Sequence, residues 1–123
     1  MPAIPAQQII DAILDAFRES RCQAELRSAV RVHPRKFRVI QEGGEAFTVW
    51  IYIWTVTHGG YPRSANEFRI QMTSVSSPLA LNPDGHTVLL GWDPNLEVFA
   101  GFDLERHQTF TTGSPSVQIA LSA

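Results

Sequence analysis

The chain has 123 residues, 44% of them apolar, and ten Lys and Arg against twelve Asp and Glu give a formal net charge of −2. This length suits one domain with an ordinary core, and no run approaches the roughly 18 apolar residues that would suggest a membrane span. The first residues lack the basic and apolar regions of a secretory signal, and a single cysteine, Cys22, excludes an internal disulfide. We therefore expect one cytoplasmic domain over residues 1–123.

Charge is distributed unevenly along the chain. From Arg18 to Arg69, nine basic residues oppose five acidic ones, a net of +4, whereas from Ile70 onward Arg106 alone opposes five acidic residues, a net of −4. The negative total is unfavourable for binding nucleic acid, but the basic segment is suited to phosphates. Its cations are arginines except Lys36, and a guanidinium fits phosphate oxygens and the guanine edge. Genomic GC bias combined with solvated strand faces would produce the same composition.

Apolar residues at helical spacing predict an amphipathic helix near the N-terminus. They recur at i, i+1, i+4, i+5 and i+8 from Ile9 to Phe17, and polar residues occupy the other side. Pro5 suits the first turn of this helix, and Arg18 and Arg21 suit the negative end of its macrodipole.

Alternating patterns predict about seven strands after the helix. They are expected over residues 23–32, 36–41, 46–57, 66–73, 87–92, 97–103 and 116–121. A longer helix is the alternative for the first of them. Glycine, proline and asparagine predict turns at residues 42–45, 82–85 and 93–95, and loops at 58–65 and 105–114. The fold class is therefore α+β, with the helix packed on a mostly antiparallel, strongly twisted sheet that closes partly into a barrel.

Motifs of the common enzyme classes are missing from the sequence. The one lysine follows Pro34 and Arg35, so the acidic residues that a PD-(D/E)xK nuclease needs before its lysine are not there. The four histidines are scattered and Cys22 is alone, which does not match the spacing of a zinc site. There is no G-x-S-x-G elbow or Walker loop. A Cys22–His nucleophile pair stays open, although an isolated cysteine near a helix end is usually a packed apolar residue. We expect no metal, no cofactor and no catalytic residue.

Aromatic residues are frequent enough to include a pocket that stacks on an extruded base. The candidates are Trp50, Tyr52, Trp54, Tyr61, Trp92, Phe99 and Phe102. Most of these rings must belong to the core, and Tyr61 and Trp92, which are nearest to polar loops, are the preferred pocket residues. His58 and Arg63 flank Tyr61 in a glycine-rich loop suited to a phosphate or a base edge, and Ser114 and Ser116 offer hydroxyl groups. These four are also ordinary turn residues.

Four stretches resemble the N-terminal recognition domain that precedes nuclease modules in bacterial restriction endonucleases, such as those fused to HNH-type nucleases. They are residues 50–60 (WIYIWTVTHGG), 67–71 (EFRIQ), 98–107 (VFAGFDLERH) and 114–119 (SPSVQI). The resemblance covers residues 50–119, and the helix matches it only in character. In several such families the module reads a modified base while a separate C-terminal nuclease cuts, and readers of this kind include barrel-like SRA and B3 folds.

The resemblance implies a non-catalytic DNA-recognition module of a modification-dependent restriction system. Its expected partners are double-stranded DNA, modified or not, and a nuclease that is either C-terminal to it or a separate protein; a homodimer is also open. The residues expected to contact DNA are Arg31, Arg35, Lys36, Arg38, His58, Tyr61, Arg63, Arg69, Trp92, Ser114 and Ser116. Two alternatives remain. One is a protein-interaction or oligomerisation domain with a surface of exposed Trp and Tyr, and the other is a small-ligand barrel or an unrecognised hydrolase.

Overall fold

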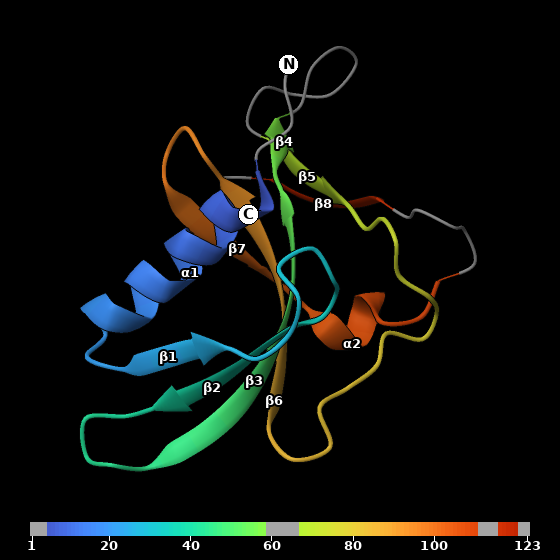
Figure 1. The fold of residues 1–123 in the computed structure, drawn as a ribbon. Coiled ribbons are helices and arrows are strands. Elements are labelled where there is room, and N and C mark those ends of the chain that lie inside the picture. Colours follow the sequence, from blue (N-terminus) through green and yellow to red (C-terminus); the bar gives the residue numbers. More distant parts are fainter. Residues whose placement is uncertain (1–4, 59–66, 111–115, 121–123) are drawn as a thin grey trace. The chain divides into compact units, whose positions relative to one another are not determined.

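A computed structural model describes residues 5–58, 67–110 and 116–120 of the chain (Figure 1). The chain divides into two compact units, and each is described by itself. Unit 1 comprises Met1–Tyr52 with Leu81–Val88, and unit 2 comprises Ile53–Ala80 with Leu89–Ala123. Two long strands, β3 (Ala46–Thr55) and β6 (His86–Asp93), begin in unit 1 and end in unit 2.

Unit 1 combines the N-terminal helix with a β-meander. Its further elements are α1 (Ala6–Glu19), β1 (Gln23–Leu26) and β2 (Arg35–Ile40). β1 pairs antiparallel with β2, and β2 pairs antiparallel with β3, so that Arg35 lies opposite Ile51. The hairpin between β2 and β3 forms where glycines predict it, with Gly44 at a φ of +92°. The first predicted strand is shorter than expected, because a turn in which Val32 N–H donates to Ala29 O (3.3 Å) follows the last ladder bond.

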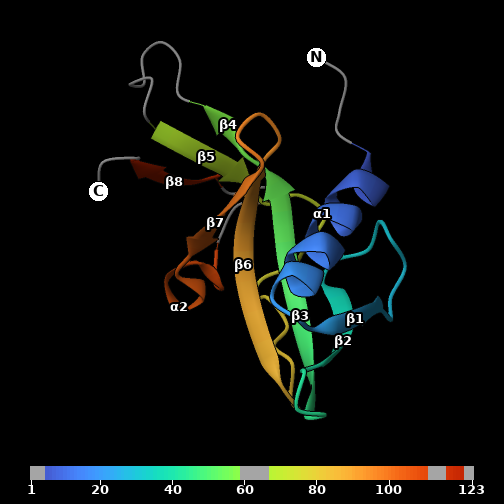
Figure 2. The same cartoon turned by 90° about the vertical axis from the view of Figure 1, so that its left-hand side faces the viewer.

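The helix α1 confirms the predicted amphipathic pattern and covers part of the meander. It lies beside β1, as both views show (Figure 1 and Figure 2). Ile9, Ile10 and Ile13 are buried, and the ring of Phe17 contacts that of Phe37 on β2 at 6.1 Å between centroids. Each fully buried aliphatic side chain contributes about 1.5–3 kcal/mol, so this apolar stripe holds the helix on its neighbours. The helix ends where Arg21 adopts a left-handed φ of +62°.

The two long strands run in the same direction as neighbours in one sheet. In unit 1, Gly85, just before β6, lies so close to β3 that a Cβ atom there would be 2.2 Å from the carbonyl oxygen of Thr48. In unit 2, the N–H of Val56, just after β3, donates to the carbonyl of Trp92 near the end of β6 (2.8 Å). The sheet is therefore mixed, since its other pairings are antiparallel.

Unit 2 adds strands and one short helix around its own core. Its further elements are β4 (Thr57–His58), β5 (Glu67–Gln71), β7 (Val98–Phe102), α2 (Leu104–His107) and β8 (Ser116–Ala120). The apolar core includes Val56, Ile70, Met72, Leu79 and Leu89. The helix α2 interrupts the polar loop predicted over residues 105–114, because the Asp103 side chain accepts from the N–H groups of its first turn.

The predicted partly closed barrel is wrong. The described strands form a five-stranded sheet in the order β1-β2-β3-β6-β7 and a separate three-stranded sheet in the order β4-β5-β8. The strand predicted over residues 46–57 divides between them, because β3 ends at Thr55 and Thr57 pairs with Arg69 of β5. The alternating pattern continues across this change of partner, since alternation reports which face is buried and not which strand is the neighbour. The helix with a mostly antiparallel sheet is confirmed.

Candidate nucleic-acid interface

The outward face of β2 carries cations side by side. Along this strand Arg35, Phe37 and Val39 are buried, whereas Lys36 and Arg38 are exposed. Successive side chains of a strand point to opposite faces, so the two exposed cations share one face and stand about 7 Å apart along the strand. The burial pattern thus separates the basic residues of this segment into a solvent face and a core face.

A groove of about 290 Å³ runs over this face within unit 1. We call it the β2 groove. Its lining residues are Arg27, Lys36, Phe37, Arg38, Thr48, Trp50, Asn82, Pro83 and Asp84. Strand register brings most of them together, because Lys36 lies opposite Trp50 and Arg38 lies opposite Thr48. The groove therefore combines three cations, one indole ring and one carboxylate.

The ammonium group of Lys36 lies over the ring of Trp50. Its Nζ atom is 4.4 Å from the ring centroid, which is the geometry of a cation–π contact. Contacts of this kind are worth about 0.5–1 kcal/mol at exposed sites. The contact positions the lysine at the groove without neutralising its charge.

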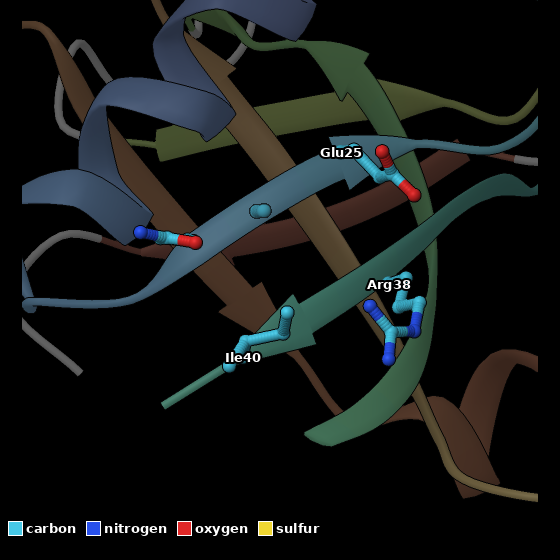
Figure 3. A pocket seen from close by; sticks show the side chains of 5 residues that line it. Glu25, Arg38 and Ile40 are labelled. Atoms are coloured by element: carbon cyan, nitrogen blue, oxygen red, sulfur yellow. The ribbon is translucent and has the colours of Figure 1, made fainter. Parts of the chain in front are cut away.

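Acidic neighbours offset the cations only in part. Arg27 forms an ion pair with Glu25 of β1, and both side chains are more than half exposed. Among the described residues no ion pair to Lys36 or Arg38 is found. Arg38 also lines a second hollow, of about 180 Å³, with Glu25 and Ile40, as Figure 3 shows. Lys36 and Arg38 are thus available to an anionic ligand.

The far wall of the groove is a turn that is bonded to β3. The side-chain amide of Asn82 donates to Thr48 Oγ1 (2.9 Å), and its backbone N–H donates to Thr87 Oγ1 (2.8 Å). The Asn82 side-chain oxygen accepts from the N–H of Asp84 (3.0 Å). The close approach of Gly85 to Thr48 fixes the same turn. This wall is therefore preformed, which favours ligand binding because no ordering is needed.

The structure distributes the predicted DNA-contacting residues over several places. Lys36 and Arg38 meet in the β2 groove, and Arg31 is exposed in the turn before β2. His58 belongs to β4 and Ser116 begins β8, both in unit 2. Tyr61, Arg63 and Ser114 lie outside the described residues.

Arg35 and Arg69 differ from the other predicted cations by their buried atoms. Arg35 is only 5% exposed, and its Nε and Nη1 atoms are buried and have no hydrogen-bond acceptor among the residues that the structure describes. Burial lowers the pKa of its guanidinium from the ordinary value. Arg69 on β5 also has a buried Nε that finds no acceptor in the described part of the chain. Arg35 points to the core face of β2, opposite to Lys36 and Arg38.

Trp92, one of the two preferred aromatic candidates, is a core residue in this structure. It is 7% exposed and packs against Phe99 at 4.8 Å between ring centroids. The ring that reaches a groove is that of Trp50, which sequence reasoning placed among the candidates without preferring it. The predicted hairpin held only an approximate signal, because counting outward from Gly43 and Gly44 pairs Lys36 with Ile51, one residue from the observed partner Trp50. The roles of Arg27 and of the turn at Asn82 had no such signal.

The part of the chain that the structure describes holds neither a metal-binding cluster nor a membrane-spanning helix. No group of three or more His, Cys, Asp or Glu residues is arranged there to hold a metal ion. Neither described helix has the length and apolar character needed to cross a membrane.

These features define an α+β domain with a basic and aromatic groove on one face of its sheet. The model of the Methylase-associated X1 family matches residues 47–123, more than half of the chain, and the chain belongs to this family. The family description associates the domain with methylases. The match includes Thr48, Trp50 and the turn at Asn82, whereas Lys36 and Arg38 precede it. Comparisons with curated proteins and with solved structures return no match.

Proposed function

We propose that this chain is a non-catalytic DNA-binding module that works with a methylase and holds duplex DNA at the β2 groove. One observation carries the proposal. Lys36 and Arg38 are exposed on the same face of β2, have no ion pair among the described residues, and adjoin Arg27 and Trp50. Guanidinium and ammonium groups arranged in this way match the oxygens of neighbouring phosphates.

Local charge supports the proposal better than total charge. The chain carries a net charge of −2, yet the groove is lined by three cations and the single carboxylate of Asp84, and only Arg27 among the three cations is paired, with Glu25, among the described residues. Phosphate binding depends on contacts within about 8–10 Å at physiological salt, because more distant charges are screened. The methylases of restriction-modification systems act on DNA, so a module that binds the same substrate suits the family's association with a methylase.

The salt dependence of DNA binding tests the proposal. Three phosphate contacts predict that log K falls against log salt with a slope of about −2.7, since each contact contributes about −0.9. We expect Arg38→Gln to weaken binding of a fluorescent duplex, measured by anisotropy, and to reduce the slope by about 1. Arg18→Gln is the matched control, because Arg18 is exposed on α1 and paired with Asp15. Equal binding by the two variants would contradict the proposal.

We further propose that the module recognises a modified base, which is more specific than DNA binding in general. It is supported by the resemblance to restriction-endonuclease recognition domains, whose stretches lie inside the region matched by the family. A gel-shift series tests it, with one duplex sequence carried unmodified, with 5-methylcytosine, with N6-methyladenine and with phosphorothioate. Preference for one modified duplex supports a reader of that modification, whereas equal affinities support binding to DNA in general.

Exposed aliphatic residues favour a second candidate function, a protein-interaction or oligomerisation surface. Among the residues whose burial the structure describes, four large aliphatic side chains are about half exposed: Val32, Leu81, Leu96 and Val98. Leu96 and Val98 are two residues apart where the turn after β6 leads into β7, and neighbouring exposed apolar side chains commonly mark an interface. This function predicts an oligomer that forms with increasing protein concentration and is indifferent to DNA. Sedimentation of the chain with and without duplex separates the two functions.

A further inference from the structure

We infer that Trp50 is a stacking platform for one unpaired nucleotide base, and that the β2 groove binds DNA most tightly where a base has left the duplex. The inference rests on the proposed function and adds the state of the nucleotide that is recognised. The inference assigns the aromatic contact to Trp50 in place of Tyr61 and Trp92, the two rings that the sequence analysis preferred.

The first support is the position of the ring. Trp50 is half-buried on β3 and lines the groove, whereas Trp92 is buried against Phe99. A base stacks on the face of an aromatic ring, so a platform needs an accessible face and cations nearby for the phosphate. Trp50 meets both conditions within unit 1.

The second support is the contact with Lys36. Its ammonium lies 4.4 Å from the ring centroid, so this π-face is covered by an exposed side chain of β2 and not by the core. An exposed cation–π contact is weaker than the stacking of a base on the same ring, so a base can replace the ammonium. The displaced lysine then lies beside the phosphate of the stacked nucleotide.

The third support is the arrangement of charge around the ring. Arg38 stands two residues beyond Lys36 on the same face, about 7 Å along the strand, which is close to the separation of neighbouring phosphates on one nucleic-acid strand. The carboxylate of Asp84 lines the opposite wall and repels phosphate, but it accepts hydrogen bonds from an exocyclic amino group. The groove therefore orients the base toward the turn and the backbone toward β2, and it favours an amino-bearing base such as cytosine.

The experiment compares two duplexes with the same number of phosphates. In one a central cytosine pairs with guanine, and in the other the same cytosine faces an abasic site and is unpaired. We expect Trp50→Leu to weaken binding of the unpaired probe by about 5- to 150-fold, the loss for removing one base–aromatic stack. The paired probe should lose less than twofold. Trp50→Phe retains a π-face and should keep most of the preference, whereas Arg38→Gln should weaken both probes equally.

Separate results refute the inference and the proposed function. If no probe binds wild-type protein at low salt, both fail. If both probes bind and Trp50→Leu changes them equally or not at all, DNA binding stands and the platform is refuted. Circular dichroism verifies that each variant is folded. Should Trp50→Leu not fold, tryptophan fluorescence decides: quenching by the unpaired probe in the wild type and its loss in Trp50→Phe support the platform, and quenching that persists overturns it.

Discussion

Replacement of Arg35 by methionine is expected to stabilise the protein. The side chain is 5% exposed, and two of its nitrogen atoms are buried with no acceptor among residues 5–58, 67–110 and 116–120. A buried donor without a partner costs about 1–3 kcal/mol, and a charged group costs more. Methionine keeps the length of the side chain and has no polar hydrogen, so it removes this cost and leaves only a small cavity. The pKa of Arg35, lowered by burial, points to the same desolvation.

The relief of one of the two unpaired nitrogen atoms sets a lower bound on the size of the effect. The free energy of unfolding should rise by about 1–3 kcal/mol. For 123 residues, an unfolding entropy of about 2.1 cal/mol/K per residue converts each kcal/mol into roughly 4 °C, so the melting temperature should rise by about 4–12 °C. Urea denaturation gives the free energy, and an unchanged m-value would show that the unfolding reaction is the same.

Two control variants complete the experiment. Arg31→Met changes an exposed arginine in the neighbouring turn and should shift stability by no more than about 0.5 kcal/mol. Arg35→Ala leaves a cavity and should not share the gain. Loss of more than about 1 kcal/mol in Arg35→Met would refute the reasoning, because it would mean that the guanidinium has favourable partners. DNA affinity should be unchanged in this variant, since Arg35 points away from the β2 groove.

Two further predictions concern the wall of the groove and the short helix of unit 2. Gly85→Ala should destabilise the protein by about 1–3 kcal/mol in thermal unfolding, because the new Cβ would be 2.2 Å from the Thr48 carbonyl oxygen, whereas Gly43→Ala has open space and should be nearly neutral. Burial, with help from the charge of Arg106, lowers the pKa of His107. As the pH falls, the histidine of the unfolded state, with a pKa of about 6.5, therefore binds a proton before that of the folded state. The free energy of unfolding is unaffected by His107 above about pH 6.5 and decreases as the pH falls toward the pKa of the folded state. His107→Gln should reduce the loss of unfolding free energy between pH 7.5 and 5.5; an unchanged or larger loss would contradict the assignment.

Local patterns in the sequence were sufficient for the elements that depend on neighbouring residues. The spacing of Ile9, Ile13 and Phe17 predicts α1, because a helix places residues three to four apart on one face. Glycine and asparagine at residues 82–85 predict the turn that became the wall of the groove, because their backbone and side chains favour turn geometry. The basic character of β2 is likewise visible in the sequence, since it depends only on residue types.

Contacts between distant residues needed the tertiary structure. The alternation of side chains along β2 puts Arg35 and Lys36 on opposite faces of the strand. Which of these faces is buried is decided by the packing of α1 and its neighbours. The division into two sheets depends on which strand pairs beyond Thr55, and the parallel placement of β3 and β6 joins segments far apart in the chain. Sequence by itself therefore determined the local elements and the charge of the β2 face. Tertiary structure alone placed Asn82 against Thr48 and made the groove, because long-range pairing is selected by side-chain packing and not by local propensity.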